Sequence, residues 1–136
     1  MSSKNRIFDV LTVLEDGAGT ITESAAGSNA SLDLGGGGQE SVGPQLPVNA
    51  EVELDVSTLD FTAENETYEA KIQVSNSATF DSGVVDVNQR DVVATGKYNI
   101  PVTNEVNGTV YRYMRIYFTL GGTTPIILCT ACLTKH

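Results

Sequence analysis

The stretch from residue 110 to residue 120, followed at once by a Gly-Gly pair, constrains the fold of this chain more than any other. Successive side chains of a β-strand point to opposite faces, so a period of two divides this stretch into two sets. One set includes the apolar residues Met114, Ile116, Phe118 and Leu120; the other includes Tyr111, Tyr113, Arg115 and Tyr117. The stretch contains no Pro or Gly and can therefore pair along both edges. We predict a central strand whose apolar face packs against a second layer.

The second face of this strand is the candidate functional surface. Tyr and Arg combine a large contact area with hydrogen-bonding tips, and both are enriched where proteins meet other proteins. Tyr111, Tyr113, Arg115 and Tyr117 are accordingly predicted to form a protein interface. The alternative is that these side chains cover the sheet beneath a long loop.

Other segments show the same alternation or the turns that connect strands. Residues 50–56 and 68–74 alternate apolar with polar side chains, and Asn107-Gly108 is typical of a tight turn. Two short strands are expected at 84–87 and 92–95 around a polar bend at 88–91, with Phe80 entering the core from a loop. The apolar run at 125–134 is expected to form a C-terminal hairpin with 110–120 through residues 121–124. Brief strands are also expected at 20–23 and 31–34.

These elements add up to about eight strands and no helix. Strands at short spacing, separated by turn signals, predict an all-β fold, an antiparallel β-sandwich of jelly-roll type. The 136 residues fit a single domain, 1–136, with a short N-terminal arm at about 1–14 and a Gly/Pro-rich loop at 35–47. Within the arm, the spacing of apolar residues at 7–14 fits either an irregular strand or a turn of helix. The glycine run at 35–38 lacks a following Lys-Ser/Thr and a helix pattern, so we interpret it as a surface loop and not as a phosphate-binding loop.

Charge and hydropathy exclude several classes of partner. Lys and Arg number 8 against 17 Asp and Glu, a formal net charge of −9, and no basic patch is present to neutralise phosphates. We therefore expect no direct binding to nucleic acid. No stretch is apolar enough to span a membrane, and residues 7–14 are too short and too polar for a signal peptide.

Residues that support catalysis or bind metals are scarce. His136, the single histidine, is the last residue, so no catalytic relay is expected and the chain is predicted not to be an enzyme. Cys129, Cys132 and His136 supply three of the four ligands that zinc prefers, and a strand places residues three apart on opposite faces. We predict two buried core thiols, no metal and no cofactor. The carboxylates at 51, 53 and 55 are predicted to form a solvated acidic ridge.

Several short segments share their order and spacing with a known family: residues 7–12, 31–35, 72–77 with Phe80, and above all 113–122, with Ala131 and Leu133 closing the last strand. In these segments the chain resembles the small capsid cement, or decoration, proteins of tailed bacteriophages. Members of that family resemble jelly rolls that sit as trimers on the outside of an icosahedral head and clamp neighbouring copies of the major capsid protein. The cysteines of the last strand and the four glycines at 35–38 depart from the family pattern.

The resemblance implies a structural protein of the virion, located on the outer surface of the capsid. Its implied partners are the major capsid protein and two further copies of itself, as a homotrimer. A carbohydrate-binding, lectin-like β-sandwich is the alternative, with the tyrosines as a sugar platform, although the chain contains no Trp. Binding only to assembled shells favours the first hypothesis, and binding to a glycan array favours the second.

Overall fold

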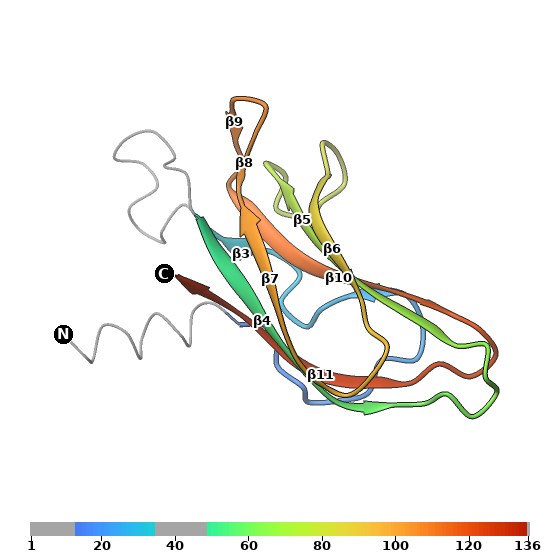
Figure 1. Cartoon of the computed structure of the whole chain (residues 1–136). Helices are drawn as coiled ribbons and strands as arrows, with labels where there is room; N and C mark the ends of the chain where they lie inside the picture. The colour runs from blue at the N-terminus through green and yellow to red at the C-terminus, as the bar shows by residue number, and fades with distance from the viewer. Residues whose placement is uncertain (1–12, 35–48, 136) are drawn as a thin grey trace.

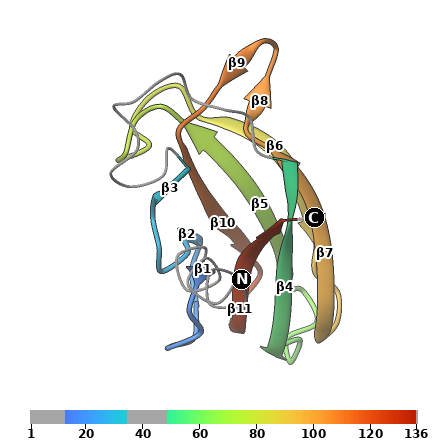
Figure 2. The same ribbon diagram turned by 90° about the vertical axis from the view of Figure 1, so that its left-hand side faces the viewer.

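The computed structural model describes residues 13–34 and 49–135. Within these ranges the chain is all-β and without helices, and two antiparallel sheets pack against each other as a β-sandwich (Figures 1 and 2). Eleven strands are present there, against about eight expected. Six of them have seven or more residues, and the other five have two or three.

The first sheet contains four strands. Its order is β1 (Val13–Glu15), β11 (Ile127–Lys135), β4 (Asn49–Leu59) and β7 (Gly96–Thr103). The second sheet has the order β2 (Ala25–Ala26), β10 (Tyr113–Gly121), β5 (Thr67–Ser75) and β6 (Val85–Asp91), and β3 (Leu32–Asp33) also pairs with β10. The predicted central strand is confirmed, because β10 lies between β5 on one side and β2 and β3 on the other.

The core lies between the two sheets and is built by period-two alternation. On β10 the buried side chains are Met114, Ile116 and Phe118, all at most 1% exposed. They belong to the same cluster as the alternating apolar residues of β4, β5 and β11, namely Ala50, Val52, Leu54, Val56, Tyr68, Ala70, Ile72, Val74, Ile127, Cys129, Ala131 and Leu133. The alternation predicted at 50–56 and 68–74 is therefore confirmed.

Residues 13–34 close one side of the sandwich by crossing from the first sheet to the second. Glu15 is buried, and its carboxylate accepts hydrogen bonds from the backbone N–H of Gly17 at 3.0 Å and of Ser28 at 2.9 Å. Both carboxylate oxygens thus have a donor in place of the water they lose. At Gly27 a Cβ would lie 2.5 Å from the carbonyl oxygen of Leu14, so only glycine lets the crossing segment pack this closely.

The predicted C-terminal hairpin is wrong. β10 and β11 are consecutive strands, but β10 belongs to the second sheet and β11 to the first. The connection crosses the end of the sandwich, where Gly122 has φ +98° and Asn65 donates a hydrogen bond from Nδ2 to Oγ1 of Thr123 at 2.9 Å. Both arrangements bury the same alternating residues, so the period-two pattern alone did not distinguish them.

Three shorter predictions also change. The polar residues 88–91 belong to β6 and do not form a bend, while residues 92–95 connect β6 to β7 and are not a strand. β6 is the edge strand of the second sheet and faces solvent along much of its length, so its polar composition resembles that of a turn. At 20–23 only an isolated bridge forms, between Ile21 and Ile127.

The β8–β9 hairpin (Glu105–Val106 and Thr109–Val110) projects beyond the two sheets (Figures 1 and 2). Its turn is the predicted Asn107-Gly108, with φ values of +52° and +82°. The arm predicted at 1–14 lies outside the described residues except for its last two, which open β1, and the loop predicted at 35–47 lies wholly outside them.

Candidate protein-binding face

Tyr113, Arg115 and Tyr117 lie together on the outer face of the second sheet, and we call this surface the Tyr/Arg face. They alternate along β10 with the buried Met114 and Ile116, so they point away from the core. Each is half-buried, because the neighbouring strands pair with β10 on both sides. The predicted common face is confirmed for these three residues.

Tyr111 is not part of the Tyr/Arg face. It precedes β10, and its side chain packs against the hydrophobic core. Its backbone is held by the buried Asn104, whose Nδ2 donates to the carbonyl of Tyr111 at 2.8 Å while the N–H of Tyr111 donates to the carbonyl of Asn104 at 2.8 Å. The prediction applied the period of two to Tyr111, which lies two residues before β10 begins. The alternation of faces holds only within the strand.

Arg115 is the most constrained side chain of the face. Its guanidinium carbon lies 4.4 Å from the ring centre of Phe80 and 5.3 Å from that of Tyr117. Its Nε donates a hydrogen bond to Oε1 of Gln73 on β5 at 2.8 Å. Cation–π contacts with two rings and a hydrogen bond along Nε fix both the plane and the direction of the guanidinium.

Arg115 remains charged at neutral pH. Burial lowers the pKa of its guanidinium below its ordinary value, and Tyr117 and Asp86 act in the opposite direction. Arginine retains its proton in proteins, so partial burial weakens its hydration and leaves its charge intact. The face therefore presents an oriented and partly desolvated cation.

Phe80 is a residue of the site that sequence reasoning assigned to the core. It is 7% exposed, as expected of a buried residue, but it is not a member of the main core cluster. Its ring lies under the guanidinium of Arg115, and its φ is +55°. A bulky residue in this backbone region is rare, and the turn residues around it at 77–83 were the only available signal.

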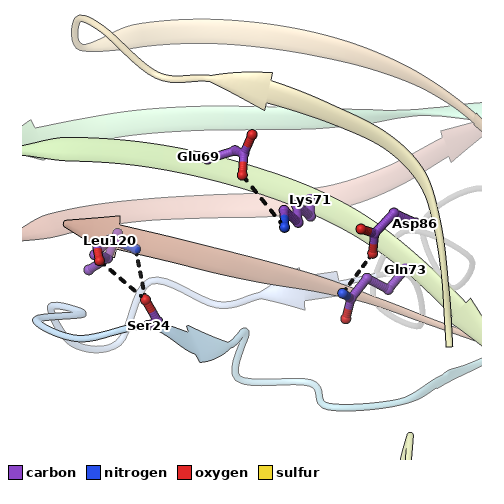
Figure 3. A network of polar contacts seen from close by, with 6 residues as sticks. All are labelled: Ser24, Glu69, Lys71, Gln73, Asp86 and Leu120. Atoms are coloured by element: carbon purple, nitrogen blue, oxygen red, sulfur yellow. Dashed lines mark hydrogen bonds and ion pairs between the residues drawn. The ribbon is translucent and has the colours of Figure 1, made fainter. Parts of the chain in front are cut away.

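Polar pairs surround Arg115 on the same sheet. Gln73, which accepts the hydrogen bond from Arg115, donates from Nε2 to Oδ1 of Asp86 at 2.8 Å, and Lys71 lies 3.7 Å from Glu69. Figure 3 shows these two pairs one after the other along β5. In the same view Ser24 and Leu120 exchange two hydrogen bonds, with Leu120 N–H donating to Oγ of Ser24 at 2.9 Å.

Arg112 borders the face and is paired with a carboxylate. Its Nε and Nη2 donate to the two carboxylate oxygens of Asp33 on β3, both at 2.9 Å. The guanidinium also lies 5.3 Å from the ring centre of Tyr113. This bidentate geometry is the strongest form of the Arg–carboxylate interaction, and it ties β3 to the start of β10.

The two cysteines lie on opposite faces of β11, as strand geometry predicts. Cys129 is buried, whereas Cys132 is partly exposed, so the prediction of two buried core thiols is correct for Cys129 only. Burial raises the pKa of the Cys129 thiol to about 12, with smaller contributions from Glu15 and Asp55.

No group of three or more His, Cys, Asp or Glu side chains suited to a metal ion occurs within 13–34 and 49–135.

The outer face of the first sheet carries the acidic ridge. Glu53 and Asp55 on β4 are exposed and Glu51 is partly exposed. Across the strand pair, Asp55 is in register with Lys97 of β7. The outer faces of the two sheets therefore differ, one being acidic and the other aromatic with an oriented cation.

Comparisons with protein-family models, curated proteins and solved structures found no match to this chain. In the part of the chain that the structure describes, no helix is long and apolar enough to cross a membrane.

Proposed function

We propose that this protein is a capsid cement, or decoration, protein that binds the outside of an assembled icosahedral phage head. The observation that carries the proposal is the Tyr/Arg face, where two tyrosines flank an arginine that is fixed before any partner binds. Aromatic residues and arginine dominate the energetics of protein interfaces, and a side chain already held in place loses little entropy on binding. The resemblance of the sequence to phage decoration proteins supports the same reading.

The order of the strands supports the jelly-roll assignment that accompanies this proposal. β1 pairs with β11, β2 with β10, β4 with β7, and β5 with β6. The first half of the chain thus pairs with the second half in reverse order, like one long hairpin wrapped around a core. Eight strands in two sheets with this nested pairing are the arrangement expected of a jelly roll.

The partners in this proposal are the major capsid protein and two further copies of the chain. A protein that binds the assembled shell, and not the free subunits, stabilises the shell by mass action. A homotrimer that contacts several capsid subunits at once gains avidity, so weak individual contacts suffice to hold it on the surface. In this role the protein reinforces heads and does not direct their assembly.

The test compares heads with and without the protein. Decorated heads are expected to release DNA at a higher temperature than stripped heads, and the increase should follow the logarithm of the free protein concentration. Purified protein should co-sediment with assembled shells and not with dissociated capsid subunits. Equal heat resistance of stripped and decorated heads would contradict the cement role, and failure to assemble any shells without the protein would place its action earlier.

A variant pair connects this result to the Tyr/Arg face. Tyr117→Ala removes an aromatic ring from the face, whereas Asn99→Ala changes an exposed residue of β7 on the first sheet. We expect Tyr117→Ala to weaken binding to heads, because the Tyr/Arg face is the proposed contact between copies and avidity depends on the trimer. Asn99→Ala should leave binding unchanged, and the reverse result would show that head binding does not depend on the Tyr/Arg face.

A further inference from the structure

We propose that Arg115 binds one Asp or Glu carboxylate presented by a neighbouring copy of this chain. The inference rests on the self-association proposed above and assigns its central contact. The geometry, the surrounding charges and the composition of the chain support it independently of one another.

The guanidinium of Arg115 is fixed, yet neither of its terminal nitrogens is used by the residues that the structure describes. Nε donates to Gln73, the rings of Phe80 and Tyr117 lie against the guanidinium, and Asp86 attracts its charge. Nη1 and Nη2 donate to no acceptor among residues 13–34 and 49–135. The two η nitrogens of an oriented guanidinium form a planar fork that matches the two oxygens of a carboxylate.

The other cations at this face already have carboxylate partners. Lys71 is paired with Glu69, and Arg112 with Asp33. Among the described residues no carboxylate oxygen lies at ion-pair distance from Arg115. Its side-chain acceptor is the neutral amide of Gln73, and Asp86, which attracts its charge, accepts a hydrogen bond from that amide. A carboxylate from another molecule could form with Arg115 the kind of bidentate pair that Asp33 forms with Arg112.

A carboxylate on a protein surface fits this site better than a free anion. The chain carries a formal net charge of −9, which repels small anions and polyanions at long range. Beyond a Debye length of about 10 Å at about 0.1 M salt this repulsion is largely screened, whereas a contact between partly buried groups persists. The rings of Tyr113 and Tyr117 beside Arg115 add apolar contact area that only a large partner can cover.

A second copy of the chain is a rich source of the required group. Asp and Glu outnumber Lys and Arg by 17 to 8, so most carboxylates of a copy have no cation of their own to pair with. Glu53 and Asp55, for example, are exposed on the outer face of the first sheet. Arg115 lacks a carboxylate at ion-pair distance among residues 13–34 and 49–135, and an excess of carboxylates on a second copy is complementary to it.

The experiment measures the molar mass of the full chain by size exclusion with light scattering over a range of concentrations. Arg115→Gln removes the charge and the fork, and Arg115→Lys keeps the charge without the fork. Gln73→Glu retains Arg115 but supplies an internal carboxylate that competes with the external one. Lys71→Gln is the matched control, because Lys71 lies on the same face, in register with Tyr117, and its charge is already paired.

We expect the wild type and Lys71→Gln to associate equally. Arg115→Gln, Arg115→Lys and Gln73→Glu should each weaken association on the order of 10- to 100-fold per interface, the range for a charge-assisted hydrogen bond. Thermal melts by circular dichroism establish that each variant is folded. Unchanged association in folded Gln73→Glu and Arg115→Gln would overturn the inference, as would equal weakening by Lys71→Gln.

Binding to heads separates this inference from the proposed function. If the wild type co-sediments with shells and Arg115→Gln associates with itself as the wild type does, the role of Arg115 is wrong and the cement function stands. If association depends on Arg115 but no form of the protein binds shells, the cement function is wrong and the Arg115 contact stands. A wild type that remains monomeric at all concentrations overturns the inference whatever its binding to shells.

Discussion

Cys129 and Arg115 show how the surroundings of a residue decide its chemistry. Cys129 lies between the sheets, where burial favours the neutral thiol and makes it a packing group. Arg115 lies on the outer face, where stacking and one hydrogen bond orient its charge without neutralising it. Neither role follows from residue type alone, because the same side chains on the opposite face of their strands would have the opposite exposure.

The raised pKa of Cys129 predicts a loss of stability at alkaline pH. The thiol loses its proton near pH 9.0 in the unfolded chain but near pH 12 in the folded protein. Between these values the unfolded state binds fewer protons than the folded state, so the free energy of unfolding decreases as pH rises; below pH 9.0 the contribution of the thiol is fully present. The slope attributable to this thiol is at most about 1.4 kcal/mol per pH unit.

Urea unfolding at several pH values between neutral and strongly alkaline measures this effect. Cys129→Ala should be less stable than the wild type at neutral pH, because it leaves a small cavity, but its stability should fall less steeply above pH 9.0. Tyrosines and lysines titrate in both proteins and cancel in the comparison. Identical slopes for the two proteins would show that the thiol ionises normally in the folded state.

At the scale of elements, period-two alternation identified the long strands, while their connections followed from contacts distant in sequence. The connection between β10 and β11 packs against the one between β4 and β5, because Gly122 approaches Asn65 and Glu66 closely. The buried Glu66 accepts a hydrogen bond at Oε2 from Oγ1 of Thr124 at 3.1 Å. This contact joins the two loops at the place where the chain crosses from β10 in the second sheet to β11 in the first.

Gly122→Ala is expected to destabilise the protein strongly. A Cβ at this position would lie 2.6 Å from the carbonyl oxygen of Asn65 and from Cα of Glu66, and φ is +98°. The conformational penalty is about 1 to 2 kcal/mol, and the backbone clash adds to it. Gly83→Ala is the matched control, with φ +62° and nothing within 4 Å of the added carbon. Chemical denaturation should show a clearly larger loss for Gly122→Ala, and equal losses would mean that the crossing loop adjusts freely.

At the scale of the whole molecule, the two outer faces of the sandwich have different chemistry. One presents the Tyr/Arg face and the other the acidic ridge with the exposed Glu53 and Asp55. A protein that used one face for its own copies would leave the other for a second partner or for solvent.

We predict that the isolated protein is a homotrimer. The resemblance of the sequence to phage decoration proteins implies a trimer, and burial of the Tyr/Arg face would remove aromatic surface from water. Light scattering during size exclusion should give three times the chain mass of 14.4 kDa at tens of micromolar protein. A monomer under these conditions would contradict the prediction for the free protein.

The sequence by itself determined the all-β class, the long strands, the central position of β10 and the common face of three of the four residues predicted for it, Tyr113, Arg115 and Tyr117. These features could be predicted because a strand that buries one face alternates apolar and polar residues, and this alternation is visible in consecutive residues. The structure alone decided that β10 and β11 lie in different sheets, that 88–91 belong to an edge strand, and that Phe80 lies under Arg115 outside the core cluster. It also removed Tyr111 from the face and Cys132 from the core. These features depend on contacts between segments far apart in the chain. The alternation within one segment does not determine which other segment it contacts.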